Sequence, residues 1–242
     1  MKKYYTRACN FSYGVHSRRL IKKKKALPLN GNLDICFEHI EIISRKGSKI
    51  ISLNDVKKLP ENLKKKAKSD LKIISRRKKN FSNFNFNKLP NIMGVLNLTP
   101  DSFSDGGKYN KKKLGYNHAI NLYKQGSNIV DIGGESTRPT SKEINEKEEW
   151  KRIRLTLTKL RKKKIPISLD TRKSTVMIKG IKLGINLIND VSGLNFDKKT
   201  IKVLKKYNKP FVIHHIQGNP MTMQNNPKYK NVLLDIYDYF EE

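Results

Sequence analysis

The stretch NIMGVLNLTPDSFSDGG, from Asn91 to Gly107, carries the strongest structural signal in the chain. Its first part, Ile92 to Leu96, is a short apolar run that predicts a buried strand, and the strand ends on the polar residue Asn97. The loop that follows is rich in Gly, Ser, Asp and Pro, which are typical turn residues. We therefore predict a strand that delivers a polar loop to one edge of a sheet.

The same pattern recurs in VDIGGESTRP, ISLDTRKS, LINDVSGL and FVIHHIQGNP, which end at Pro139, Ser174, Leu194 and Pro220. Apolar strands that finish on polar residues are typical of parallel α/β folds, in which the active face lies at the carboxyl ends of the strands. The predicted strands span residues 92–96, 129–132, 167–169, 185–188 and 211–214. The predicted helices span residues 113–125, 144–163, 174–182, 197–207 and 230–242.

The motifs NLTPDSFSDGG, GGESTRP, SLDTRKS, INDVSGL and HHIQGNPMTMQ, in this order, resemble those of the dihydropteroate synthases. The resemblance runs from about Ile92 to the last residue. It implies a (β/α)8 TIM barrel and a transferase of folate biosynthesis. Such an enzyme condenses (7,8-dihydropterin-6-yl)methyl diphosphate with 4-aminobenzoate to 7,8-dihydropteroate and pyrophosphate. The resemblance also implies Mg²⁺ as cofactor and small-molecule substrates.

The barrel is expected to be incomplete in this chain. Five βα units fit between residue 89 and Glu242, whereas an eight-unit barrel takes roughly 250 residues. The family's later motifs, which carry an Asp, a Lys, an Arg and a His, do not occur before Glu242. We therefore expect a C-terminally truncated chain with little activity by itself.

Asp170 ends the third strand of this series and is predicted to point into the barrel mouth. A buried carboxylate there accepts paired hydrogen bonds, and by resemblance Asp170 is the catalytic pterin anchor. The alternative role is a helix N-cap, which Thr171 or Ser174 can take instead. Asn189 ends the next strand, where its amide both donates and accepts, and it resembles the second pterin ligand. Neighbouring Asp190 is expected to face the helices or cap a turn.

Asn97 offers a neutral oxygen that suits Mg²⁺, and by resemblance it is the metal ligand. Two loops resemble lids over the substrate. In the first, Asp101 and Asp105 are expected near the metal or leaving group and Phe103 over the aminobenzoate. In the second, the residues Thr137, Arg138 and Pro139 are expected to bind substrate, although Arg138 has the alternative of pairing with Glu135.

Two histidines follow the fifth strand of the series. His215 matches the family's histidine in H-x-x-G-x-P, and His214 stands where an apolar residue is more usual. A single histidine at a strand end is more often structural than catalytic. The predicted catalytic set therefore contains neither histidine.

Residues 1–80 are predicted to form a small basic α+β region of unknown role, and residues 81–242 the pterin-binding barrel domain. In the front part a turn is expected at residues 26–31, a strand at residues 35–43 and a helix at residues 60–74. The aromatic segment FSNFNF, residues 81–86, predicts a strand that closes the bottom of the barrel.

The net charge of +31 is concentrated at the front, where residues 1–90 carry 24 Lys or Arg against 6 Asp or Glu. One interpretation is nucleic-acid binding by residues 1–80, with Tyr4, Tyr5, Phe11 and Tyr13 stacking on bases. No nucleic-acid motif supports it, so we expect no nucleic-acid partner and favour a domain that accompanies the barrel.

The remaining signals concern location and the alternative enzyme. Two cysteines are too few for a disulfide framework, and no apolar run is long enough to span a bilayer, so we predict a cytoplasmic protein without a membrane partner. The resemblance allows a homodimer of the full-length protein.

The alternative enzyme is a methyltetrahydrofolate methyltransferase, whose pterin barrel also uses Asn and Asp at strand ends. The loops TPDSFSDGG and GGESTRP fit the synthase better.

Overall fold

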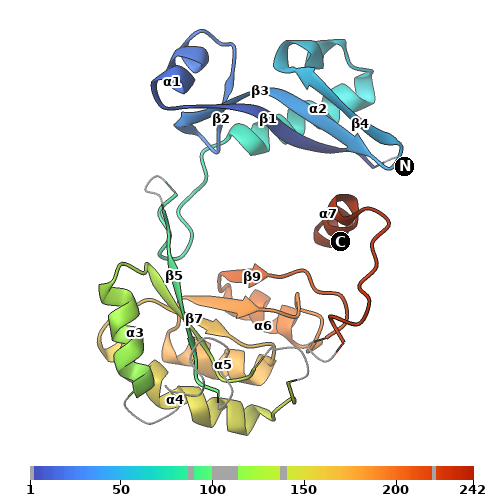
Figure 1. The fold of residues 1–242 in the computed structure, drawn as a ribbon. Coiled ribbons are helices and arrows are strands. Elements are labelled where there is room, and N and C mark those ends of the chain that lie inside the picture. Colours follow the sequence, from blue (N-terminus) through green and yellow to red (C-terminus); the bar gives the residue numbers. More distant parts are fainter. Residues whose placement is uncertain (1–2, 87–89, 100–113, 137–140, 220–221) are drawn as a thin grey trace. The chain divides into compact units, whose positions relative to one another are not determined.

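The computed structural model describes residues 3–86, 90–99, 114–136, 141–219 and 222–242, and it divides into two compact units (Figure 1). The first unit joins Met1–Lys79 to Lys230–Glu242, and the second is Asn80–Tyr229. The sequence-based division placed everything after residue 80 in one domain. The structure instead groups the last segment with the N-terminal unit.

The second unit is built on a parallel sheet with the strand order β5-β6-β7-β8-β9. These strands lie where the sequence predicted strands, with shifts of one or two residues at their ends. The order is sequential because each strand is followed by a helix that returns the chain to the next edge position. Among the described residues the sheet does not close into a barrel. The strands are β5 (Met93–Asn97), β6 (Ile129–Gly133), β7 (Ile167–Asp170), β8 (Leu187–Asp190) and β9 (Phe211–Ile213).

Four helices alternate with these strands, and helices that are neighbours along the chain pack against one another (Figure 1). Right-handed crossovers in a sequential parallel sheet place such helices on one face. The longest, α4, begins after Asn145, whose side chain accepts from the backbone amides of Lys147 and Glu148. Its sequence therefore fixes its start. The helices are α3 (Leu114–Lys124), α4 (Glu146–Lys162), α5 (Ser174–Leu183) and α6 (Thr200–Tyr207).

The alternation of strand side chains gives the sheet an apolar and a polar face. Leu96, Ile132, Leu169 and Ile188 contribute to the buried core beneath the helices. The residues one position away point to the opposite face, because successive side chains alternate in a strand. That second face carries the polar residues at the carboxyl ends of the strands, so the helices leave it available for a site.

The prediction of a strand at residues 81–86 is wrong. Phe81 and Phe84 pair with each other through two backbone hydrogen bonds of 3.2 and 2.8 Å, so the segment is a tight turn. Ser82 takes a left-handed backbone conformation with φ of 51°. Ser and Asn between the two phenylalanines favour the turn, and this preference outweighs the alternation of aromatic residues.

The first unit is an antiparallel sheet with helices, as expected for an α+β region. Its central strand, β3 (Asn32–Ser44), pairs with β1 (Tyr5–Tyr13) along one edge. The strands β2 (Leu27–Leu29) and β4 (Gly47–Ser52) share the other edge. The sequence predicted β3 and the helix α2, but β1, β2 and β4 were not expected. The turn predicted at residues 26–31 contains the strand β2 in its first part. The helical segments are α1 (Gly14–Lys22), the 3-10 helix η1 (Leu53–Lys58), α2 (Glu61–Ser75) and α7 (Val232–Glu241).

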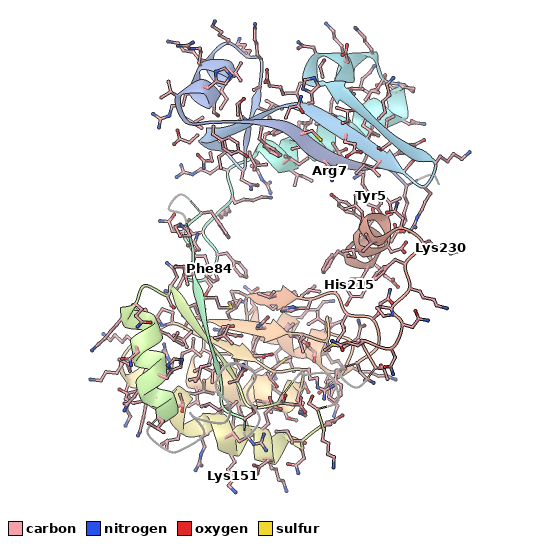
Figure 2. The ribbon with its side chains drawn as sticks, viewed as in Figure 1. Tyr5, Arg7, Phe84, Lys151, His215 and Lys230 are labelled. Carbon is pink, nitrogen blue, oxygen red and sulfur yellow. The ribbon has the colours of Figure 1, made fainter. Side chains whose placement is uncertain are left out.

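The helix α7 packs into this first unit through a small apolar cluster, and Arg45 forms ion pairs with its Asp235 and Asp238. Leu234 is 1% exposed and lies with Tyr5 and Ile43. Tyr5 is labelled in Figure 2. Its ring stacks on that of Tyr237 with 4.5 Å between centroids, and its hydroxyl donates to Asp238. Tyr5 is therefore a core residue of the unit.

No helix in the described ranges is long and apolar enough to cross a membrane.

Candidate active site

One row of residues crosses the carboxyl edge of the parallel sheet. Asn97 is in register with Gly133, Gly133 with Asp170, and Asp170 with Asn189. Residues in register in a parallel sheet point to the same face, so the three polar side chains gather there. The structure thus brings together the three sequence-predicted site residues that it describes.

Gly133 makes room for two of these side chains. A Cβ atom at this position would lie 3.1 Å from Asp170 Oδ2 and 3.2 Å from Asn97 Oδ1. Both oxygens therefore approach the same point above the glycine. The neighbouring glycine, Gly134, has a different surrounding. A Cβ at Gly134 would instead meet Ile153 at 2.8 Å and the backbone of α4 at 2.9 Å, so packing against the helix requires that glycine.

Asp170 lies in a strongly acidic environment. Burial raises the pKa of its carboxyl well above the usual value, and the negative charges of Asp131, Glu149, Asp190 and Glu135 raise it further. A carboxyl of this kind holds its proton more readily than one in water. Hydrogen-bond donors on a ligand would lower the cost of ionising this carboxyl.

Asn189 sits between two partners on the same face. Its Nδ2 donates to Asp131 Oδ2 over 3.0 Å, and its Oδ1 lies 2.6 Å from His214 Nε2. Asp131 is 4% exposed, and burial raises the pKa of its carboxyl, while the hydrogen bond from Asn189 opposes this shift. The amide of Asn189 is therefore held from both sides.

A buried ion-pair network involves Arg172 and Lys173, which follow Asp170 closely in the sequence. Lys173 Nζ is 2.8 Å from Glu135 Oε1 and 2.9 Å from Glu149 Oε2, and Arg172 Nε is 2.8 Å from Glu135 Oε2. Burial alone would raise the pKa of Glu135, but the hydrogen bonds from Arg172 and Lys173 outweigh it and lower that pKa. The network ties the segment after β6 to the segment after β7.

Glu135 has several partners among the described residues. Its carboxylate binds Arg172, Lys173 and the backbone amide of Ile144. These contacts fix the side chain of Glu135, which stands just before the second predicted lid in the sequence. Arg138 itself lies outside the described residues. The pairing of Glu135 with Arg138 stays a prediction.

The alternative role of Asp170 as a helix cap is not what the structure shows. The residue before α5 makes no side-chain cap, and the backbone amide of Ser174 donates to Asp197 Oδ2 over 2.9 Å. The expectation for Asp190 is confirmed, because its Oδ1 accepts from the amide and the hydroxyl of Ser192 in the turn after β8. Asp170 is thus available for a ligand.

The remaining predicted site residues lie outside the described part of the chain. The described residues contain no group of three or more His, Cys, Asp or Glu side chains able to hold a metal ion. The carboxamide oxygen of Asn97 beside the carboxylate of Asp170 is a small, hard donor set. Such a set fits Mg²⁺, which keeps most of its waters and takes few protein ligands. The residues not described are Asp101, Phe103, Asp105, Thr137, Arg138 and Pro139.

Sequence reasoning missed Asp131 and passed over His214. Asp131 stands two residues before Gly133 on β6, so it points to the same face as the row. A polar residue inside an otherwise apolar strand was the available signal. Val212 on β9 is in register with Asn189, and His214 stands two residues after Val212. The same two-residue spacing would have identified it.

Comparison with known proteins gives a consistent family. The sequence profile of the family described as "Pterin binding enzyme" matches residues 93–242. The dihydropteroate synthase of Neisseria meningitidis serogroup B is 43% identical over 154 residues, which is 63% of this chain and 54% of that protein.

Solved structures agree with this similarity. A dihydropteroate synthase structure from Clostridium difficile, in the presence of pteroic acid, is 40% identical with a TM-score of 0.58, and the match covers 65% of this chain and 58% of that one. The Xanthomonas albilineans dihydropteroate synthase with 4-aminobenzoic acid is 32% identical with a TM-score of 0.54, covering 62% and 53%. This chain spans about half the length of the curated relatives it matches.

Proposed function

The chain belongs to the pterin-binding enzyme family, and from this membership we propose that its protein carries out the dihydropteroate synthase reaction. In that reaction the amine of 4-aminobenzoate displaces pyrophosphate from (7,8-dihydropterin-6-yl)methyl diphosphate. The observation that carries the proposal is the row of Asn97, Asp170 and Asn189 at the carboxyl edge of the sheet. It supplies a metal-type donor, a carboxylate and an amide on one face.

Asp170 is proposed as the pterin anchor and as a catalytic residue. Its raised pKa means that ionisation is costly in the empty site, and hydrogen bonds from pterin N–H groups offset that cost. The ionised carboxylate then stabilises positive charge that develops on the pterin as pyrophosphate leaves. Asn189 is proposed to bind a second edge of the heterocycle with the donor and acceptor that remain on its amide.

Mg²⁺ is proposed as the cofactor, held by Asn97, and when bound it would neutralise charge on the departing pyrophosphate. Asp101 and Asp105 are proposed to act in the same region. Phe103 is proposed to exclude water from the aminobenzoate, and Thr137, Arg138 and Pro139 to bind substrate. The buried network at Glu135 supports the last group, because it fixes the residue that precedes Ser136 and Thr137.

The proposal is tested by binding and by turnover. We expect pteroic acid to bind the 242-residue chain in a calorimetric titration, and Asp170→Ala to weaken binding about 10- to 100-fold through loss of a charge-assisted hydrogen bond. Lys151→Ala, an exposed change on α4, is the matched control (Figure 2). Turnover is measured on the full-length protein with labelled 4-aminobenzoate and pterin diphosphate. Methyl transfer to a corrinoid, without dihydropteroate, would refute the proposal in favour of a methyltetrahydrofolate methyltransferase.

Two further parts of the proposal rest on the sequence. We propose a cytoplasmic location, which agrees with only two cysteines in the chain. A homodimer of the full-length protein stays a prediction. For the first unit we favour a role other than nucleic-acid binding, because Tyr5, one of the aromatic residues available for base stacking, is 7% exposed and stacked on Tyr237.

A further inference from the structure

Three side chains on the polar face of the parallel sheet form a continuous chain of hydrogen bonds. Asp131 comes from β6, Asn189 from β8, and His214 follows β9. The two contacts are 3.0 Å from Asn189 Nδ2 to Asp131 Oδ2 and 2.6 Å between Asn189 Oδ1 and His214 Nε2. The backbone carbonyl of Asn189 also accepts from the amide of Thr171 over 3.1 Å. Asn189 is therefore held at its backbone and at both ends of its amide.

The direction of these bonds follows from the chemistry of the groups. The Asn189 nitrogen donates to the Asp131 carboxylate, so the oxygen of the amide is the atom that faces the imidazole. Two acceptors at 2.6 Å would repel, so His214 carries a proton on Nε2 and donates it. Rotation of the amide by 180° would set its oxygen against the carboxylate and its NH₂ group against the imidazole N–H. The amide is thus locked in one of its two orientations.

The lock leaves a defined recognition pattern. A carboxamide has two donor hydrogens and about two acceptor positions, and each of the two contacts uses one of them. One N–H and one oxygen lone pair of Asn189 remain, in an order fixed by Asp131 and His214. A heterocycle edge that carries an acceptor beside a donor matches this pattern in one direction only.

We propose that His214 is a positioning residue that fixes the Asn189 amide for pterin recognition. The proposal rests on the proposed function, because it takes the pterin as the ligand that Asn189 reads. His214 does not contact the reacting atoms in this account. It acts through Asn189, so its loss lowers affinity for the pterin and leaves the fold in place.

The test uses the 242-residue chain and three variants. His214→Met supplies a side chain of similar volume that has no hydrogen-bond donor. His214→Gln restores an N–H group at the end of the side chain. His215→Met is the matched comparison, because this adjacent imidazole has a different neighbour, the ring of Tyr229, with 5.8 Å between ring centroids. The probes are pteroic acid, titrated calorimetrically, and the side-chain amide signals of Asn189 in ¹⁵N NMR spectra without ligand.

The expected result is specific to the donor. His214→Met should weaken pteroic acid binding about 2- to 10-fold, which is the range for one neutral hydrogen bond. The same variant should shift the Asn189 amide signals and speed their exchange with solvent. His214→Gln should restore both properties most of the way, and His215→Met should leave both near the wild-type values.

The possible failures are distinguishable. Wild-type chain that binds no pteroic acid would overturn the proposed function, while the amide signals still test the link between His214 and Asn189. Wild-type affinity in His214→Met would overturn the role of His214 in recognition, whether or not the amide signals move. Equal losses in His214→Met and His214→Gln would also overturn it, because a donor in that position would then be irrelevant.

Discussion

Replacing Lys173 by Met should destabilise the second unit strongly. The side chain of Lys173 is 8% exposed and lies between the carboxylates of Glu135 and Glu149, which are 5% and 0% exposed. Removing one partner of a buried ion pair costs about 3–5 kcal/mol, because the remaining charge is left without compensation. Arg172 still pairs with Glu135, so most of the cost falls on Glu149. The loss is a large share of the ~5–15 kcal/mol that stabilises a typical domain.

Urea unfolding followed by tryptophan fluorescence measures this cost in the unit concerned. Trp150 is the one tryptophan of the chain, and it follows Glu149 on α4 and packs against the core of that unit. With a urea slope of about 2 kcal/mol per molar, the midpoint should fall by roughly 1.5–2.5 M. Lys151→Met removes an exposed lysine from the same helix and should stay within about 0.5 kcal/mol of the wild type.

The pH dependence gives the stricter test. Burial already raises the pKa of Glu149, and Lys173 lowers it in part. Without Lys173 the folded-state pKa rises further above the unfolded value, so the folded state binds the proton more readily and gains stability as pH falls. The difference in unfolding free energy between the wild type and the variant should therefore shrink as the pH falls from 8 to 5. A difference below about 1 kcal/mol, or one that grows on acidification, would refute the reasoning.

Three other changes have defined outcomes. Leu234→Ala removes a side chain that is 1% exposed and should cost the first unit about 2–5 kcal/mol, seen as faster hydrogen exchange in β1 with an unchanged Trp150 transition. Gly133→Ala sets a Cβ within 3.2 Å of Asn97 Oδ1 and 3.1 Å of Asp170 Oδ2, and calorimetry should show roughly tenfold weaker pteroic acid binding. Asp170→Asn should raise the urea midpoint at pH 8 but not at pH 4. The raised pKa of Asp170 makes its ionisation costly for the folded state as pH rises, and a midpoint below the wild type at pH 8 would contradict this.

The parallel sheet could be predicted from the sequence because each of its strands has a clear local pattern. Each is a short apolar run that ends on a polar residue, and the predicted ends of β5 to β9 lie within two residues of those observed. The row of Asn97, Asp170 and Asn189 followed from the same pattern, since carboxyl ends of parallel strands meet at one edge. Local periodicity and topology were sufficient for this part.

Contacts distant in sequence could not be predicted in the same way. Lys173 binds Glu149, 24 residues earlier, and no local pattern indicates which buried carboxylate takes which cation. The pairing of β1 with β3 was also missed, because β1 is flanked by basic residues and shows no clean alternation. The turn at Phe81 shows the opposite error, in which alternation was present but turn-forming residues prevailed.

The helix α7 has a consequence for the order in which the chain acquires its structure. Its contact between Tyr5 and Asp238 joins residues 233 positions apart, and the whole second unit lies between them in the sequence. During synthesis the ribosome has released the strands β5 to β9 before it releases α7. The sheet of the first unit, β1 to β4, is therefore exposed at the Tyr5 cluster while the second unit folds. Closing so long a loop adds an entropic cost that grows only with the logarithm of its length, so the separation of 233 positions adds little to the cost of docking α7.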